Sequence, residues 1–208
     1  MKHESSILEE IVNAITHGIG ILLSIVGYII FLILANKNFS LEKTIGFNIF
    51  GLAIISSYTI STLYHSLIFT KAKKIFKILD HCTIFLLIAG TYTPFMLDRS
   101  MGEVGLILLV AIWIFTILGI IFKVIFVNKF RKLSLVFYTF MGWFIIFGVK
   151  PLLAFLPLPA LCLLISGGLF YTFGIIFYAQ KSLRFNHGIW HIFVLMGSIC
   201  HFFAMFYL

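Results

Sequence analysis

The sequence predicts an all-α integral membrane protein, a bundle of seven transmembrane helices preceded by a short amphipathic helix. Of the 208 residues, 62% are hydrophobic and only 11% are charged, whereas average globular proteins carry roughly 25% charged residues. The apolar residues form seven runs, each close to the roughly 20 residues that a helix needs to cross a bilayer. These runs lack the alternating pattern of barrel strands, which excludes a membrane β-barrel.

Short polar connections separate the seven apolar runs. Because the connections are short, each helix is expected to pack antiparallel to its neighbour in sequence, within a single domain over residues 1–208. The expected spans cover residues 17–35, 44–69, 78–97, 103–127, 133–149, 157–179 and 187–208.

Residues 1–16 predict a short amphipathic helix that lies in the membrane interface and leads into the first span. Ser6 and Glu9 have the spacing of a capping box at a helix start. Apolar residues then recur at helical spacing, on the face opposite Glu10 and Asn13, as in helices that lie on a membrane. The alternative is a frayed polar tail.

The basic residues predict the orientation of the bundle in the cell membrane. Eleven of the fifteen Lys and Arg residues lie on the side that carries the N-terminus and the connections after the second, fourth and sixth spans. Cytoplasmic loops carry such an excess of positive charge, so we expect a cytoplasmic N-terminus and an external C-terminus. Because the charges lie in short breaks between spans, the net charge of +8 does not indicate nucleic-acid binding.

Histidines gather in one leaflet of the predicted bundle. Ionisable groups inside lipid are costly and usually functional. His201 lies about 20 Å deeper than the start of its helix by the rise per residue, and we expect it to be a buried hydrogen-bonding residue. The histidines that this orientation places toward the cytoplasm are His17, His65, His81, His187 and His191.

Three of these histidines have the pattern of a metal site. His187 and His191 are four residues apart, so both lie on one face of a helix, where two imidazoles can bind one ion. His65, from a neighbouring helix, completes a three-histidine site for Zn²⁺ that leaves one position open for water. Neutral imidazoles leave the full charge on the ion, and that charge activates water for hydrolysis.

Two further residues are candidates for the chemistry beside such a metal. Asp80, at the cytoplasmic start of the third span, can hold the reacting water and accept its proton. Ser61 lies one turn before His65 on the same helical face. Taken alone, Asp80 is equally consistent with a helix cap and Ser61 with a hydroxyl bonded to its own helix.

Four segments, in the same order along the chain, resemble the haemolysin III family, the bacterial branch of the progestin and adiponectin receptor group. This resemblance implies seven helices with a cytoplasmic N-terminus, and zinc bound toward the cytoplasmic leaflet by the residues that match His65, His187 and His191. It also implies that Asp80 holds the water on the zinc and that Ser61 is the serine of the same motif. The segments are EEIVNAITHGIG (9–20), SSYTISTLYHS (56–66), LDHCTIFLLIAGTYTPF (79–95) and NHGIWHIFVLMGSICH (186–201).

Three functions are consistent with these features. The receptor branch of the group is associated with hydrolysis of lipid amides, and bacterial relatives are linked to membrane homeostasis, which favours a zinc-dependent hydrolase of a membrane lipid amide or ester. The family name implies instead a cytolytic, pore-forming haemolysin. A sensor of membrane state with structural zinc is the third hypothesis. The sequence does not specify the lipid or the oligomeric state.

Overall fold

The computed structural model describes residues 6–38, 40–127 and 129–208, and in this part of the chain all regular secondary structure is helical. Seven segments are long and apolar enough to cross a membrane, which confirms the seven predicted spans. The helices are α1 (Ile7–Asn38), α2 (Leu41–Ser66), α3 (Lys73–Met96), α4 (Gly102–Phe126), α5 (Arg131–Trp143), α6 (Val149–Phe155), α7 (Leu158–Ala179) and α8 (Asn186–Ala204), with short 3₁₀ helices η1 (Arg99–Met101), η2 (Phe144–Gly148) and η3 (Met205–Tyr207).

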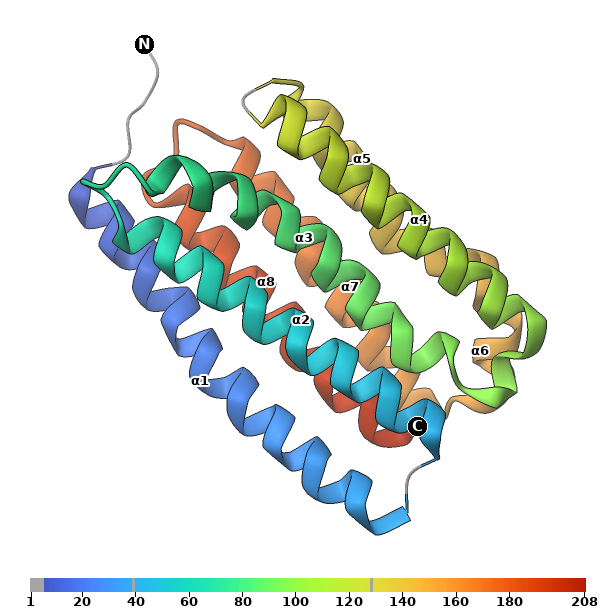
Figure 1. Ribbon diagram of the computed structural model, residues 1–208. Coiled ribbons are helices and arrows are strands. Elements are labelled where there is room, and N and C mark those ends of the chain that lie inside the picture. The colour runs from blue at the N-terminus through green and yellow to red at the C-terminus, as the bar shows by residue number, and fades with distance from the viewer. Residues whose placement is uncertain (1–5, 39, 128) are drawn as a thin grey trace.

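Successive spans run antiparallel (Figure 1). Helix α1 packs against α2, α2 against α3, α3 against α4 and α7 against α8, and α1 also packs against α8. The connections α2–α3, α4–α5 and α7–α8 therefore lie at the same end of the bundle as the start of α1 (Figure 1).

The core is rich in aromatic side chains, and rings of Phe31 and Phe47 stack with centroids 4.4 Å apart. Many apolar side chains point outward instead, such as Leu22, Ile107 and Val136, as expected where the solvent is lipid.

The first helix begins at Ile7 and continues without a break through the first span. The predicted capping box is present: the Ser6 N–H donates to Glu9 Oε2 (2.7 Å), and the Glu9 N–H donates to Ser6 Oγ (3.2 Å). The polar face of these turns is buried in the bundle, since Glu10 and Asn13 are 5% and 2% exposed. Residues 1–5 of the predicted amphipathic segment lie outside the described residues.

The fifth span extends beyond the predicted end at residue 149 and is not a single α-helix. It consists of α5, η2 and α6 and reaches Phe155. Tyr92 of α3 supplies hydrogen bonds at the break, where its hydroxyl donates to the Met141 carbonyl (2.8 Å) and accepts from the Ile145 N–H (2.6 Å). Broken helices are tolerated at membrane depth only when such partners satisfy the freed backbone groups.

Replacement of Tyr92 by phenylalanine is therefore expected to destabilise the bundle. Tyr92→Phe keeps the ring but leaves the Ile145 N–H without its hydroxyl partner, at a cost of about 1–3 kcal/mol. Thermal unfolding in detergent micelles should show a lower midpoint for this variant. Tyr207→Phe, at a half-exposed position near the C-terminus, is the control and should unfold like the unmodified protein; equal midpoints for all three proteins would contradict the role of Tyr92.

Candidate metal centre

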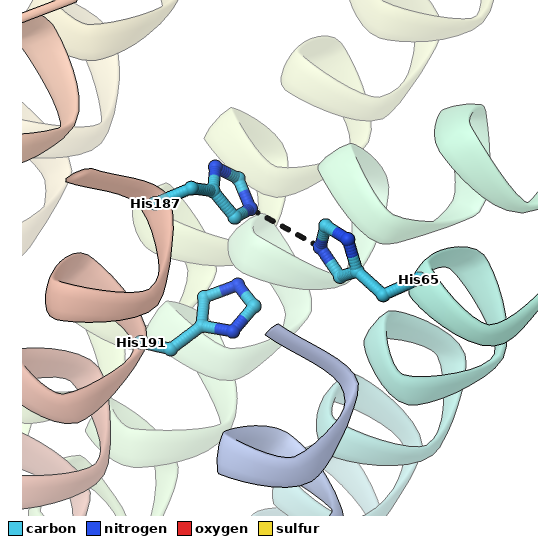
Figure 2. A group of neighbouring side chains, drawn as sticks. All are labelled: His65, His187 and His191. Atoms are coloured by element: carbon cyan, nitrogen blue, oxygen red, sulfur yellow. Dashed lines mark hydrogen bonds between the residues drawn. The ribbon is translucent and has the colours of Figure 1, made fainter. Parts of the chain in front are cut away.

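His65, His187 and His191 meet in space and form a group that can hold a metal ion. One ligand atom from each of the three side chains lies within 4.8 Å of the other two. Figure 2 shows His187 and His191 extending from α8 toward His65 of α2. His65 and His191 are buried, and His187 is partly buried. The structure thus brings together the three residues that the sequence predicts as metal ligands.

Helix ends position these three histidines. His65 lies in the last turn of α2. The α7–α8 connection ends at Phe185, whose left-handed backbone (φ 59°) turns the chain into α8. His187 and His191 therefore lie in the first two turns of α8. The α2–α3 and α7–α8 connections share one end of the bundle (Figure 1), and His65 faces His187 and His191 there (Figure 2).

Hydrogen bonds determine which ring nitrogen of two histidines carries the proton. His65 Nδ1 lies 2.6 Å from Glu10 Oε2, and His191 Nδ1 lies 3.1 Å from the Asn13 carbonyl oxygen. A carboxylate and a carbonyl only accept hydrogen bonds, so both Nδ1 atoms must donate. The lone pairs of His65 and His191 are consequently on Nε2.

The geometry of the group fits a divalent metal with nitrogen ligands. Nε2 of His65 and Nε2 of His187 are 3.2 Å apart (Figure 2). Two nitrogens bound tetrahedrally to one zinc at 2.0–2.1 Å are separated by about 3.3 Å. Nε2 of His191 is buried and has no hydrogen-bond partner among the described residues. Such an orphaned polar atom requires an explanation, and a shared metal ion supplies one.

Asp80 and Ser61 are not members of the group of three histidines. Asp80 is 5% exposed and lines the same cavity as His65 and His187. Ser61 is also buried, and its Oγ has no hydrogen-bond partner in the described part of the chain. Unlike Asp80, Ser61 is not among the side chains that line the cavity.

The cavity beside the histidines has a volume of about 1080 Å³, at the upper limit of the roughly 300–1,000 Å³ typical of small-molecule sites. It extends along α3 from Lys77 to Phe95, a distance of about 27 Å by the helical rise. Its wall is polar and charged near the histidines. Most of the remaining wall is apolar, with side chains that include Leu87, Leu152, Leu161, Leu164 and Ile175.

Two other histidines make structural contacts. The His81 ring nitrogen Nδ1 donates to the Lys77 carbonyl (2.8 Å). His201 Nε2 donates to the Leu164 carbonyl of α7 (3.2 Å), and a Cβ at Gly167 would lie only 2.3 Å from that nitrogen. Glycine is therefore required opposite His201, which confirms the buried hydrogen-bonding role predicted for this residue.

Four residues of α1 surround the predicted ligands, and no motif in the sequence marks them as part of the site. Glu10, Asn13 and Thr16 contact the two histidines, and the His17 ring stacks on the His191 ring with centroids 3.5 Å apart. Polar residues at positions 10, 13 and 17 share one helical face. This spacing is visible in the sequence, but it does not distinguish a polar face turned to water from one turned into a bundle.

Comparisons with known proteins place the chain among similar sequences. Residues 5–202 match the family described as Haemolysin-III related. The chain is 48% identical to Hemolysin-3 of Bacillus cereus over 95% of this chain and 90% of that protein. It is 47% identical to the Hemolysin-3 homolog of Bacillus subtilis (strain 168), over 96% and 94% of the two chains. The human monocyte to macrophage differentiation factor is 26% identical, over 98% of this chain and 86% of that protein.

Proposed function

The chain belongs to the haemolysin-III-related family, and on this basis we propose that it is a zinc-dependent hydrolase of a membrane lipid amide or ester, with a role in membrane homeostasis. One observation carries the proposal: two members of the three-histidine group, His65 and His187, line a long, largely apolar cavity. A lipid has a matching division, with a polar amide or ester at one end of a hydrocarbon chain.

His65, His187 and His191 are the residues that would hold the zinc. A zinc ion with three protein ligands has an open position, where it acts as a Lewis acid toward water and carbonyl oxygens. Structural zinc sites have four protein ligands, whereas the group found among the described residues has three. The ligand set therefore favours a catalytic ion over a structural one.

Asp80 is the proposed general base. Its carboxylate lines the cavity at the histidine end, where it can orient a water molecule and accept its proton. Ser61, one turn from His65, is proposed to donate its hydroxyl to the developing negative charge of the substrate oxygen. The Ser61 Oγ has no hydrogen-bond partner among the described residues. Because Ser61 does not line the cavity, this role requires a local rearrangement that turns the hydroxyl toward it.

The apolar part of the cavity would bind the hydrocarbon chain of the substrate. The length along α3 exceeds one leaflet of the hydrocarbon core, which is about 15 Å when the whole core is about 30 Å thick. Burial of apolar chain in this space gives affinity without selecting one lipid by hydrogen bonds. The substrate is thus proposed as a class, a lipid amide or ester.

A second candidate is a cytolytic pore, and the name of the Bacillus cereus relative, Hemolysin-3, supports it. A third is a sensor of membrane state in which the zinc is structural. The three functions differ in what the Asp80 carboxylate contributes: proton transfer in a hydrolase, no essential role in a pore, and folding stability in a sensor.

We also propose that the metal site faces the cytoplasm. The three histidines lie at the end of the bundle that carries the α2–α3, α4–α5 and α7–α8 connections (Figure 1). These connections and the adjoining helix turns contain most of the basic residues, and loops of this kind remain in the cytoplasm.

Zinc binding is expected to require all three histidines. His65→Ala, His187→Ala or His191→Ala should each weaken zinc binding by about 10-fold or more, because one ligand is lost. Elemental analysis and chelator competition on the purified protein measure this. His201→Ala removes an imidazole outside the group and should retain zinc. Full zinc occupancy in a His187→Ala/His191→Ala double variant would rule out the assignment.

Asp80→Asn is expected to separate the three functions. For a hydrolase, zinc should remain bound while turnover of lipid amides or esters in liposomes falls by about 10²–10⁴-fold, as when a general base is lost. Asp98→Asn, at the opposite end of the bundle, is the control. Unchanged turnover in Asp80→Asn would refute the proposed base. Dye leakage that persists would favour a pore, and a lower unfolding temperature without loss of turnover would favour a structural site.

The proposed orientation is tested by labelling single cysteines in intact cells, in a background without the native cysteines. Lys129→Cys and Ser182→Cys should be protected from a membrane-impermeant maleimide added outside, because their connections face the cytoplasm. Arg99→Cys, in the connection at the opposite end, should react. The reverse pattern would place the histidines at the outer face.

A further inference from the structure

We propose that Glu10 is a positioning residue of the metal site, which holds His65 in the orientation and tautomer that direct its Nε2 toward the ion. This inference rests on the zinc site proposed above. It assigns a function to the first turns of α1, which carry none of the three ligands.

The contact between Glu10 and His65 is short and buried. Glu10 Oε2 lies 2.6 Å from His65 Nδ1, and the side chains are 6% and 4% exposed. A hydrogen bond to a charged acceptor is stronger than a neutral one. Its loss would leave Nδ1 with only the Asn13 side-chain amide, whose nitrogen lies at the longer distance of 3.5 Å, in a site with little access to water.

This hydrogen bond restricts the His65 ring in two ways. An imidazole can turn about its side-chain bond, and a turned ring would present Nδ1 to the other histidines. Because the Glu10 carboxylate only accepts, it requires the proton on Nδ1 and leaves the lone pair on Nε2. Nε2 is the atom that faces His187 Nε2 at 3.2 Å. Carboxylates that bond a ligand histidine in this way typically raise metal affinity by about 10- to 100-fold.

Lys73 forms an ion pair with the Glu10 carboxylate oxygen that does not contact His65. Its Nζ lies 2.8 Å from Glu10 Oε1, so the two oxygens of one carboxylate bond to α3 and to α2 separately. This arrangement leaves the carboxylate little freedom to rotate. The lysine also balances a negative charge that would be costly to bury alone.

The neighbouring carboxylate provides a matched comparison. Glu9 is buried as well, but its Oε2 accepts from the Ser6 N–H and its Oε1 from the Phe185 N–H (3.3 Å). These contacts are to the backbone, not to a ligand histidine. Glu9→Gln thus changes a carboxylate of the same helix turn while the bond to His65 remains.

The test is the zinc dissociation constant of the purified full-length protein, measured by chelator competition. Glu10→Gln should weaken zinc binding by about 10-fold and Glu10→Ala by up to about 100-fold. Lys73→Gln breaks the ion pair but keeps the bond to His65, so it should have a smaller effect, and Glu9→Gln should leave the constant unchanged. Thermal unfolding in excess chelator is measured in parallel, because a purely structural Glu10 would lower stability there without changing zinc affinity.

A second measurement requires no variant. Nitrogen NMR of the zinc-loaded protein with ¹⁵N-labelled histidine should show His65 protonated on Nδ1 and bound to metal through Nε2. Zinc bound through Nδ1 of His65, or equal zinc affinity in Glu10→Ala and the unmodified protein, would overturn the inference while leaving the zinc site intact. Failure of the unmodified protein to bind zinc would overturn the proposed function, and this inference with it.

Discussion

A histidine that binds a metal inside a membrane has to satisfy both ring nitrogens, because lipid offers no water to the nitrogen that faces away from the ion. In this protein α1 meets that requirement. Glu10 and the Asn13 carbonyl accept hydrogen bonds from His65 and His191, so the Nε2 lone pairs are left for a metal. Helix α1 packs against α2 and α8, and this packing buries its polar face.

The seven spans could be predicted from the sequence because long apolar runs are a local pattern. The three-histidine group needed more: the His-x-x-x-His spacing, the shared leaflet of His65, and the resemblance to a known family. The contribution of α1 could not be predicted in the same way. Glu10 and Asn13 fit an interfacial helix equally well, since a helical period shows that two faces differ but not which face meets water. The break in the fifth span is hydrogen-bonded by Tyr92, which is distant in sequence from the backbone groups it bonds.

The shape of the cavity connects the site to the proposed chemistry. His65, His187 and Asp80 line the cavity, and a largely apolar wall continues along α3 to Phe95. A bound lipid would place its polar group beside the metal ligands and its hydrocarbon chain along that wall. Membrane position, cavity and ligand set therefore favour the same substrate class, and the open ligand position favours catalysis over a structural role for zinc.

The central claim is that three imidazoles bind one zinc ion, and X-ray absorption at the zinc edge of the purified protein tests it most directly. The account predicts nitrogen and oxygen ligands at about 2.0–2.1 Å, with the outer-shell scattering of three imidazole rings and no sulfur ligand. A sulfur ligand at about 2.3 Å, or a spectrum that one or two imidazoles explain, would contradict it.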